Sequence, residues 1–197
     1  MKKIAFALAA VLLLTLCLTG CGQPLPERAA DGSPWSEDWV SVGGVLGVDT
    51  PEELTLRENN DALAVKGMYY AAWSMGKAQP YTNEDGDEAE LYDARVDLLL
   101  AGYDAAEKAE DAAGEWLAMA EEKYRVEETE EAAYNGQTFT VVTYAFPSET
   151  APYAYGVSAF GVYRNYAVSV ELSCRESFAG DAGAVLADFL ARCHYAV

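Results

Sequence analysis

The segment of residues 72–76 (AWSMG) approximates the G-x-S-x-G motif, in which a serine at a sharp turn acts as a nucleophile, with alanine replacing the first glycine. Such a serine requires a histidine to remove its proton and an acid to orient that histidine. The chain contains one histidine, His194, close to the C-terminus. A hydrolase that uses Ser74 is therefore retained as an alternative function. The simpler interpretation is a strand that ends at a glycine turn.

A second candidate chemistry is calcium binding by residues 83–88, whose sequence NEDGDE is rich in carboxylates. Calcium prefers oxygen ligands, and Asp85, Asp87 and Glu88 could together form a weak site. The EF-hand pattern does not fit, because aligning its glycine with Gly86 places tyrosines at its first and twelfth positions. The alternative is a solvated loop, and we expect no bound metal or cofactor.

Carboxylate pairs between residues 107 and 131 offer a third kind of chemistry. Glu107 with Glu110, or Glu127 with Glu128, could act as acid and base on a glycoside. Charged runs of this kind are more often solvated helix faces, so the segment does not define an enzyme. The sequence contains no complete catalytic constellation, and we expect a protein without enzymatic activity.

Aromatic side chains could instead form a binding surface, because tyrosine and tryptophan combine an apolar ring with a hydrogen-bonding group. Both are frequent in the segments expected to form strands. We select Tyr69, Trp73, Tyr153 and Tyr155 as candidate ligand-binding residues. A groove lined by them would suit a peptide or a sugar. The alternative is that these rings pack in the core and on the faces of the sheet.

The first 21 residues carry a more specific pattern. Two lysines precede an apolar run over residues 4–18, which is shorter than the ~20 residues of a membrane-spanning helix and is typical of a signal peptide. The run leads into Leu18-Thr19-Gly20-Cys21, which resembles the lipobox of bacterial lipoproteins. The resemblance implies that residues 1–20 are removed and that Cys21 receives acyl chains such as palmitate. The protein would then be anchored to the cell membrane on its extracytoplasmic face.

Processing before Cys21 leaves 177 residues with 11 basic and 32 acidic side chains, so the net charge changes from −19 to −21. Residues 21–34 contain three prolines and few apolar side chains, which favours a flexible tether. Residues 35–197 are long enough for one domain. Nucleic acid is excluded as a partner, because phosphate binding needs clustered lysine and arginine. A protein, a peptide or a cation is compatible with this charge.

Cys174 and Cys193 are the two thiols that remain after lipidation. An exported protein can form disulfides, so their pairing is one alternative. A continuous helix expected between them would hold their Cα atoms farther apart than the ~7 Å that a disulfide allows. We therefore favour two free thiols.

Hydrophobic periodicity divides the first two thirds of the domain into strands and a helix. Residues 35–77 alternate and are rich in β-branched side chains, which predicts an antiparallel meander. Residues 80–87 are acidic and are expected to form a loop. The apolar period then lengthens to about 3.6 residues, which predicts a helix over residues 88–113. Trp116 and Met119 extend the helical pattern by another turn or two.

The last third returns to strands. The Asn-Gly pair at residues 135–136 predicts a hairpin turn, and residues 153–174 are expected to form a second hairpin. Ser169 and Glu171 alternate with apolar residues, so the last strand is expected to expose one face to water. Asp181 is expected to cap a short closing helix.

This order of elements defines an α+β fold, an antiparallel β-sheet covered by one long central helix and one C-terminal helix. It resembles PsbP-like domains, which are α/β/α sandwiches, in the order of elements over roughly residues 35–195 and in the turn Tyr134-Asn135-Gly136-Gln137. The resemblance implies the fold more than the activity, because PsbP-like domains have varied roles, many of them non-enzymatic.

The sequence therefore predicts a lipid-anchored extracytoplasmic protein that acts by binding or interaction at the cell envelope, without catalysis. A hydrolase that uses Ser74 and a carrier of a small ligand are retained as alternatives. Against the carrier, solute-binding lipoproteins are two-lobed and much longer than the 177 residues that follow the signal peptide.

Overall fold

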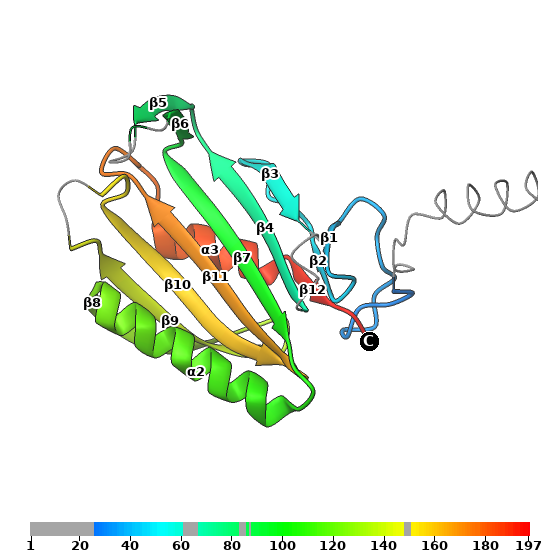
Figure 1. The fold of residues 1–197 in the computed structure, drawn as a ribbon. Coiled ribbons are helices and arrows are strands. Elements are labelled where there is room, and N and C mark those ends of the chain that lie inside the picture. Colours follow the sequence, from blue (N-terminus) through cyan, green and yellow to red (C-terminus); the bar gives the residue numbers. More distant parts are fainter. Residues whose placement is uncertain (1–25, 61–66, 83–85, 87, 148–150) are drawn as a thin grey trace, which may run out of the picture.

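A computed structural model describes residues 26–60, 67–82, 86, 88–147 and 151–197. Its helices are α2 (Ala106–Lys123) and α3 (Ala182–Ala191). Its strands are β1 (Val40–Val42), β2 (Leu46–Val48), β3 (Leu54–Asn60), β4 (Met68–Met75), β5 (Gln79–Thr82), β6 (Glu88–Leu91), β7 (Ala94–Gly102), β8 (Arg125–Tyr134), β9 (Gln137–Ala145), β10 (Tyr155–Tyr163), β11 (Tyr166–Cys174) and β12 (Cys193–Tyr195). The expected antiparallel sheet with two helices is confirmed (Figure 1).

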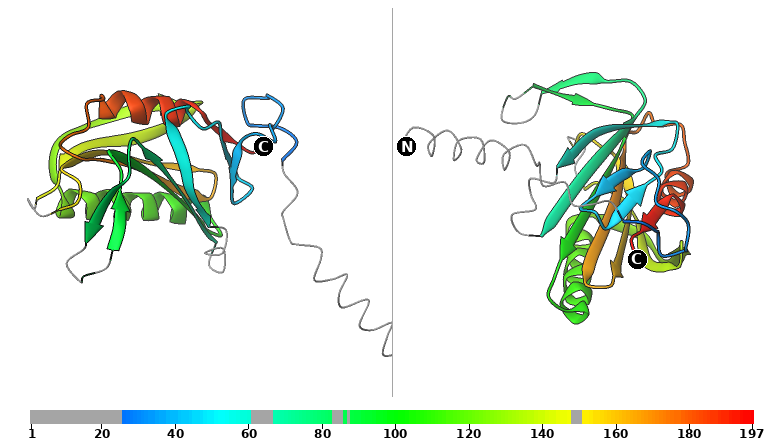
Figure 2. Two further views of the ribbon diagram at one scale, coloured as in Figure 1. Left: turned by 90° about the horizontal axis from the view of Figure 1, so that it is seen from above. Right: turned by 90° about the vertical axis from the view of Figure 1, so that its right-hand side faces the viewer.

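The main sheet has seven antiparallel strands in the order β3-β4-β7-β11-β10-β9-β8. Helices α2 and α3 lie on opposite sides of it (Figure 2, left), and we name the two faces after them. Strand β11 shows how the sequence divides the faces. Val168, Val170 and Leu172 join the core on the α3 face, whereas Ser169 and Glu171 point to the α2 face.

The α3 face holds the larger hydrophobic core. Trp73 and Phe189 are fully buried, and their rings meet edge to face with centroids 5.0 Å apart. Leu186 is buried in the same core. The carboxylate of Asp181 accepts a hydrogen bond from the backbone N–H of Ala184 at 3.1 Å, so the expected cap of the closing helix is confirmed.

Helix α2 packs on β10 and β11 through small side chains. Ala109, Ala112 and Ala113 are buried against Ala167, which lets the helix backbone approach the sheet closely. The face of β11 that we expected to be exposed to water is therefore partly covered, and Glu171 is only partly accessible. This prediction was wrong because the sequence of β11 does not show which helix lies over its polar side.

The prediction of a helix over residues 88–113 was wrong for the first part of this range. The chain forms β6 and β7 there, and α2 begins only at Ala106. Strand β7 is central, with Leu98 in the core of the α3 face and Leu99 on the α2 face. Apolar residues on both faces hide the two-residue alternation of a strand and imitate a helical period.

Strands β5 and β6 pair as a hairpin, although residues 80–87 were expected to form a loop. The hairpin leaves the main sheet on the side of α2 (Figure 2, left). Strand β8 was likewise not recognised as a strand within the acidic run that ends at Glu131. It is an edge strand with exposed glutamates, and charged side chains on an edge discourage pairing with other chains.

Both predicted hairpin turns are confirmed. The β8–β9 turn places Asn135 at φ 46°, and the β10–β11 turn places Arg164 at φ 55°. Asparagine adopts this left-handed region more readily than most residues. The side-chain amide of Asn135 also donates to the carbonyl oxygens of Ala191 and Cys193, at 2.6 and 2.8 Å. The first turn is therefore tied to the end of α3.

A second sheet of order β1-β2-β12 lies beside the main one (Figure 1). Residues 28–34, which we expected to be part of the tether, pack against its C-terminal strand. The backbone N–H of Ala30 donates to the carbonyl oxygen of Tyr195 at 2.6 Å, and Ala29 is buried. This part of the chain is therefore attached to the folded domain.

Replacing Phe189 with alanine should lower the free energy of unfolding by about 3–5 kcal/mol, because the fully buried ring would leave a cavity beside Trp73. Urea denaturation followed by tryptophan fluorescence measures the change. Met119→Ala changes an exposed apolar side chain of α2, is the matched control, and should change stability by less than ~0.5 kcal/mol. Equal losses for both variants would contradict this assignment of the core.

Candidate functional site

A groove lies on the α2 face, between the C-terminal half of α2 and strands β7, β10 and β11. We call it the α2 groove. Its volume is about 570 Å³, which is within the range of small-molecule sites. Its wall is mostly apolar or aromatic, with a few charged groups. The lining residues are Leu99, Trp116, Met119, Ala120, Glu122, Lys123, Tyr124, Phe160, Ser169 and Glu171.

The groove opens where the side chains between α2 and the sheet become large. Ala112 and Ala113 are buried in direct contact with the sheet, and the next inward-facing side chain, Trp116, is only partly buried. Phe160 of β10 rises from the sheet below the second half of the helix. Ala120 of the same half of the helix packs with Phe160, and both residues line the groove.

One wall of the groove is built on stacked aromatic rings. The ring of Tyr124 stacks on that of Tyr144 with centroids 4.1 Å apart and an interplanar angle of 6°. Phe146 meets Tyr124 edge to face at 5.0 Å. This packing fixes the Tyr124 hydroxyl beside β11. At the rim, Met119 is 65% exposed, which is unusual for a large apolar side chain.

Glu171 lies at the floor of the groove. Its carboxylate accepts hydrogen bonds from the Ser173 hydroxyl at 3.1 Å and from the Tyr124 hydroxyl at 3.4 Å. Burial raises the pKa of Glu171, and the negative charge of Asp97 acts in the same direction, against the opposing effects of Ser173 and Lys123. The surroundings therefore penalise the charged form of this carboxyl.

Asp97 lies directly opposite Glu171 in the pairing of β7 with β11, but its charge is balanced. Arg95 donates through Nε to both carboxylate oxygens of Asp97, at 2.9 and 3.0 Å. The Tyr70 hydroxyl donates to Asp97 and accepts from Nη2 of Arg95. Burial, together with Asp97, raises the pKa of Tyr70 to about 12. Of these two neighbouring carboxylates, Asp97 thus has a direct cationic partner.

Glu171 has no such partner among the residues that the structure describes, where no lysine or arginine nitrogen lies within 4.0 Å of its carboxylate. Lys123 supplies positive charge only indirectly. Its Nζ donates to the Tyr124 hydroxyl at 2.7 Å and lies 4.5 Å from the centroid of the Tyr124 ring. Tyr124 in turn donates to Glu171, so the ammonium group acts on the carboxylate through this hydroxyl.

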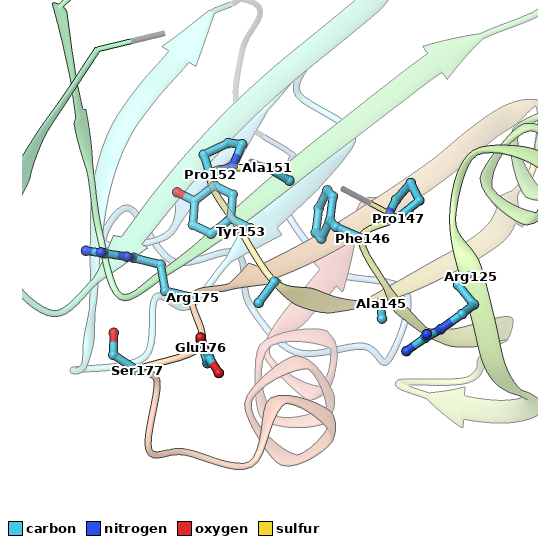
Figure 3. Close-up of a pocket in the computed structure, with 11 residues that line it drawn as sticks. Arg125, Ala145, Phe146, Pro147, Ala151, Pro152, Tyr153, Arg175, Glu176 and Ser177 are labelled. Atoms are coloured by element: carbon cyan, nitrogen blue, oxygen red, sulfur yellow. The ribbon is translucent and has the colours of Figure 1, made fainter. Parts of the chain in front are cut away.

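A larger pocket lies between the β9–β10 connection and the segment that follows β11, with a volume of about 1040 Å³. Figure 3 shows Tyr153 and Arg175 on one side of it and Arg125 on the other, with Glu176 between them. One guanidinium nitrogen of Arg175, Nη1, is buried without a hydrogen-bond partner. The pocket is open and carries both signs of charge, so it defines no single class of ligand.

The structure does not bring the four predicted ligand-binding residues together. Trp73 is fully buried, and its indole N–H donates to the Thr50 hydroxyl at 3.1 Å. Tyr69 and Tyr155 are partly buried against the same core, on the α3 face. Tyr153 lines the open pocket shown in Figure 3.

Ser74 and His194 also lie apart, in different sheets and with different partners. Ser74 is 2% exposed, and its hydroxyl oxygen accepts a hydrogen bond from Nε of Arg57 at 2.6 Å. His194 stacks on Trp39 with ring centroids 4.0 Å apart, and its Nδ1 lies 3.6 Å from the Asp31 carboxylate. The described geometry assembles no nucleophile and base from this serine and histidine.

Cys174 and Cys193 are buried, free thiols. Burial raises the pKa of Cys174 to about 12 and also raises the pKa of Cys193. A thiol must lose its proton to act as a nucleophile, so neither cysteine is activated.

Cys21 and the proposed calcium ligands Asp85 and Asp87 lie outside the described residues. In the part of the chain that is described, no three or more histidine, cysteine, aspartate or glutamate side chains are grouped to hold a metal ion. No helix within that part is both long enough and apolar enough to span a membrane.

The residues of the α2 groove were not predicted from the sequence as a site. Trp116 and Met119 were assigned only to a helical pattern, and Glu171 only to a wet strand face. One signal was present in the sequence, because Glu171 is the single acidic residue of β11. It could not be connected with Trp116 or Tyr124 until the fold placed the helix over that strand.

No protein-family model and no curated protein matches the chain. Among solved structures, it is similar to the solution structure of cyanobacterial PsbP from Synechocystis, with 13% sequence identity and a TM-score of 0.39. The similarity covers 75% of this chain and 95% of that chain. This is a weak PsbP-like resemblance, and we base no functional inference on it.

Replacing Glu171 with glutamine should make the folded protein at least as stable as the wild type at neutral pH. Burial penalises the carboxylate, whereas glutamine is neutral and keeps an acceptor for Ser173. The pKa is higher in the folded state than in the unfolded state. The wild type therefore loses stability as the pH rises from the ordinary glutamate range through this raised pKa.

Urea unfolding of both proteins at pH 7 and at about pH 4, near the ordinary pKa of glutamate, measures this effect. The difference in the free energy of unfolding between Glu171→Gln and the wild type should favour the variant most at pH 7 and should be smaller at the lower pH. A variant that is less stable than the wild type at pH 7 would show that the surroundings of Glu171 stabilise its charged form.

Proposed function

We propose that this chain is a lipoprotein of the cell envelope, anchored by lipid on Cys21, and that its extracytoplasmic domain binds a ligand without catalysis. The sequence Leu18-Thr19-Gly20-Cys21 after an apolar run supports the anchor. The single observation that carries the binding function is the α2 groove, an open hollow with aromatic walls and one carboxylate at its floor.

The apolar part of the groove would contact the apolar body of the ligand. Leu99, Trp116 and Phe160 present an apolar lining beneath the exposed Met119. A ring or short alkyl chain that enters would remove this surface from water, at roughly 25 cal/mol per Å² of apolar area. A small ligand with an apolar or aromatic body is therefore favoured over a sugar, whose surface is mostly polar.

We further propose that the domain has the α/β/α arrangement of PsbP-like domains. Its support is the order of the elements and the position of α2 and α3 on opposite faces of one sheet. This proposal concerns architecture, because the same fold can hold unrelated binding sites.

Cys21→Ser should abolish incorporation of labelled palmitate and should leave the signal segment uncleaved, because the thiol that receives the diacylglyceryl group is absent. Metabolic labelling and mass spectrometry of the N-terminus measure both effects. Cys17→Ser, which changes the other thiol of the N-terminal region, is the matched control and should remain lipidated. An unlipidated wild-type protein would rule out the proposed anchor.

Met119→Asp should weaken binding of a neutral aromatic probe, 2-phenylethanol, because it places a charge at the apolar rim of the groove. NMR titration of the full chain in lipid nanodiscs, with empty nanodiscs as a blank, should show saturable shifts of the Trp116 indole in the wild type. Val197→Asp charges an exposed apolar residue outside the groove and should bind normally. Equal binding by wild type and Met119→Asp would contradict the placement of the ligand in the α2 groove.

A further inference from the structure

We propose that the α2 groove selects a small organic amine, with its ammonium group at Glu171 and its apolar or aromatic body between α2 and the sheet. This inference rests on the proposed binding function and specifies the class of ligand. Its basis is the juxtaposition of an aromatic wall with one carboxylate that has no direct cationic partner within the described part of the chain.

The contrast between two adjacent carboxylates identifies where positive charge is missing. Asp97 and Glu171 face each other on neighbouring strands, and their charges repel. Arg95 binds Asp97 through two hydrogen bonds of 2.9 and 3.0 Å, whereas Glu171 accepts hydrogen bonds from the hydroxyls of Ser173 and Tyr124 and has no lysine or arginine nitrogen within 4.0 Å among the described residues. An ammonium group in the groove would give Glu171 a directly hydrogen-bonded positive charge, as Arg95 does for Asp97. Because the carboxylate of Glu171 is partly desolvated, such a charged hydrogen bond would be strong.

Lys123 shows that the site accommodates an ammonium group. Its Nζ already lies over the Tyr124 ring, at 4.5 Å from the centroid, and donates to the Tyr124 hydroxyl. Aromatic faces attract cations, and tyrosine is among the rings that do so. Because Lys123 is at the last turn of α2, its long side chain can move aside when a ligand's ammonium group reaches Glu171 directly.

The charge of the whole domain favours the same ligand. Glu122 adds a second carboxylate to the groove, and the chain after the signal segment carries 32 acidic against 11 basic side chains. Such a surface attracts cations and repels anions at distances up to about 8 Å at physiological salt. An anionic ligand of equal size would be repelled by the carboxylates of the groove and by the net negative charge of the domain.

Two isosteric probes test the inference on the full chain in zwitterionic lipid nanodiscs at pH 7. Phenethylammonium carries the charge, and 2-phenylethanol presents the same ring and a neutral hydroxyl. Calorimetric or NMR titration should show that the wild type binds the ammonium probe at least tenfold more tightly. Glu171→Gln should remove that preference, a tenfold loss being about 1.4 kcal/mol, while changing the affinity for the alcohol by less than twofold.

Two further variants separate a direct role of Glu171 from a general effect of the protein's charge on binding. Glu128→Gln removes one negative charge from the exposed edge strand β8, outside the groove, and should keep the preference. Lys123→Met removes the resident ammonium group and should tighten binding of phenethylammonium, because nothing then competes for the Tyr124 face. Unfolding curves of each variant confirm that it is folded at the titration temperature.

The outcomes distinguish this inference from the function on which it rests. If the wild type binds both probes equally, or if Glu171→Gln keeps the preference for the ammonium probe, the amine inference is wrong and the binding function stands. If neither probe shows saturable binding, the binding function itself fails. Weaker binding of phenethylammonium to Lys123→Met would likewise overturn the inference, since Lys123 would then assist the ligand instead of competing with it.

Discussion

Helix α2 can lie close to the sheet only where both surfaces present small side chains. Ala109 and Ala112 meet Ala167 at one end of the helix, whereas the larger side chains of Trp116 and Phe160 lie between helix and sheet farther along. The α2 groove lies on this second stretch of the contact between helix and sheet. Its location over β11 decides which strand side chains become its floor, and thereby places a glutamate in it.

A carboxylate in that position is costly to a fold that does not use it. A small apolar or hydroxyl side chain in place of Glu171 would pack beside Ser169 and Ser173 without a desolvation penalty. The protein instead balances Asp97 with Arg95 and leaves the neighbouring charge with two hydroxyl donors. A carboxylate whose burial costs stability fits the general trade-off between stability and function, because residues placed for binding are seldom optimal for stability.

Local signals in the sequence located the turns and the caps, because each depends on a few adjacent residues. Asn135 and Asp181 fall into this group, and both act as expected. Strand β7 was mistaken for a helix because it is covered on both faces, so Leu98 and Leu99 are both apolar. The α2 groove could not be predicted from the sequence, because Glu171 and Trp116 come together only when the helix packs on a strand that is distant in the sequence.

The N-terminal segment determines where the groove lies relative to the proposed anchor. Residues 28–34 pack against the C-terminal strand β12, so at most seven peptide units, or about 25 Å, separate Cys21 from the folded domain. Figure 1 places this segment and the end of α2 that leads into β8 at opposite ends of the sheet. With lipid on Cys21, the α2 groove thus belongs to the end of the domain away from the anchored segment.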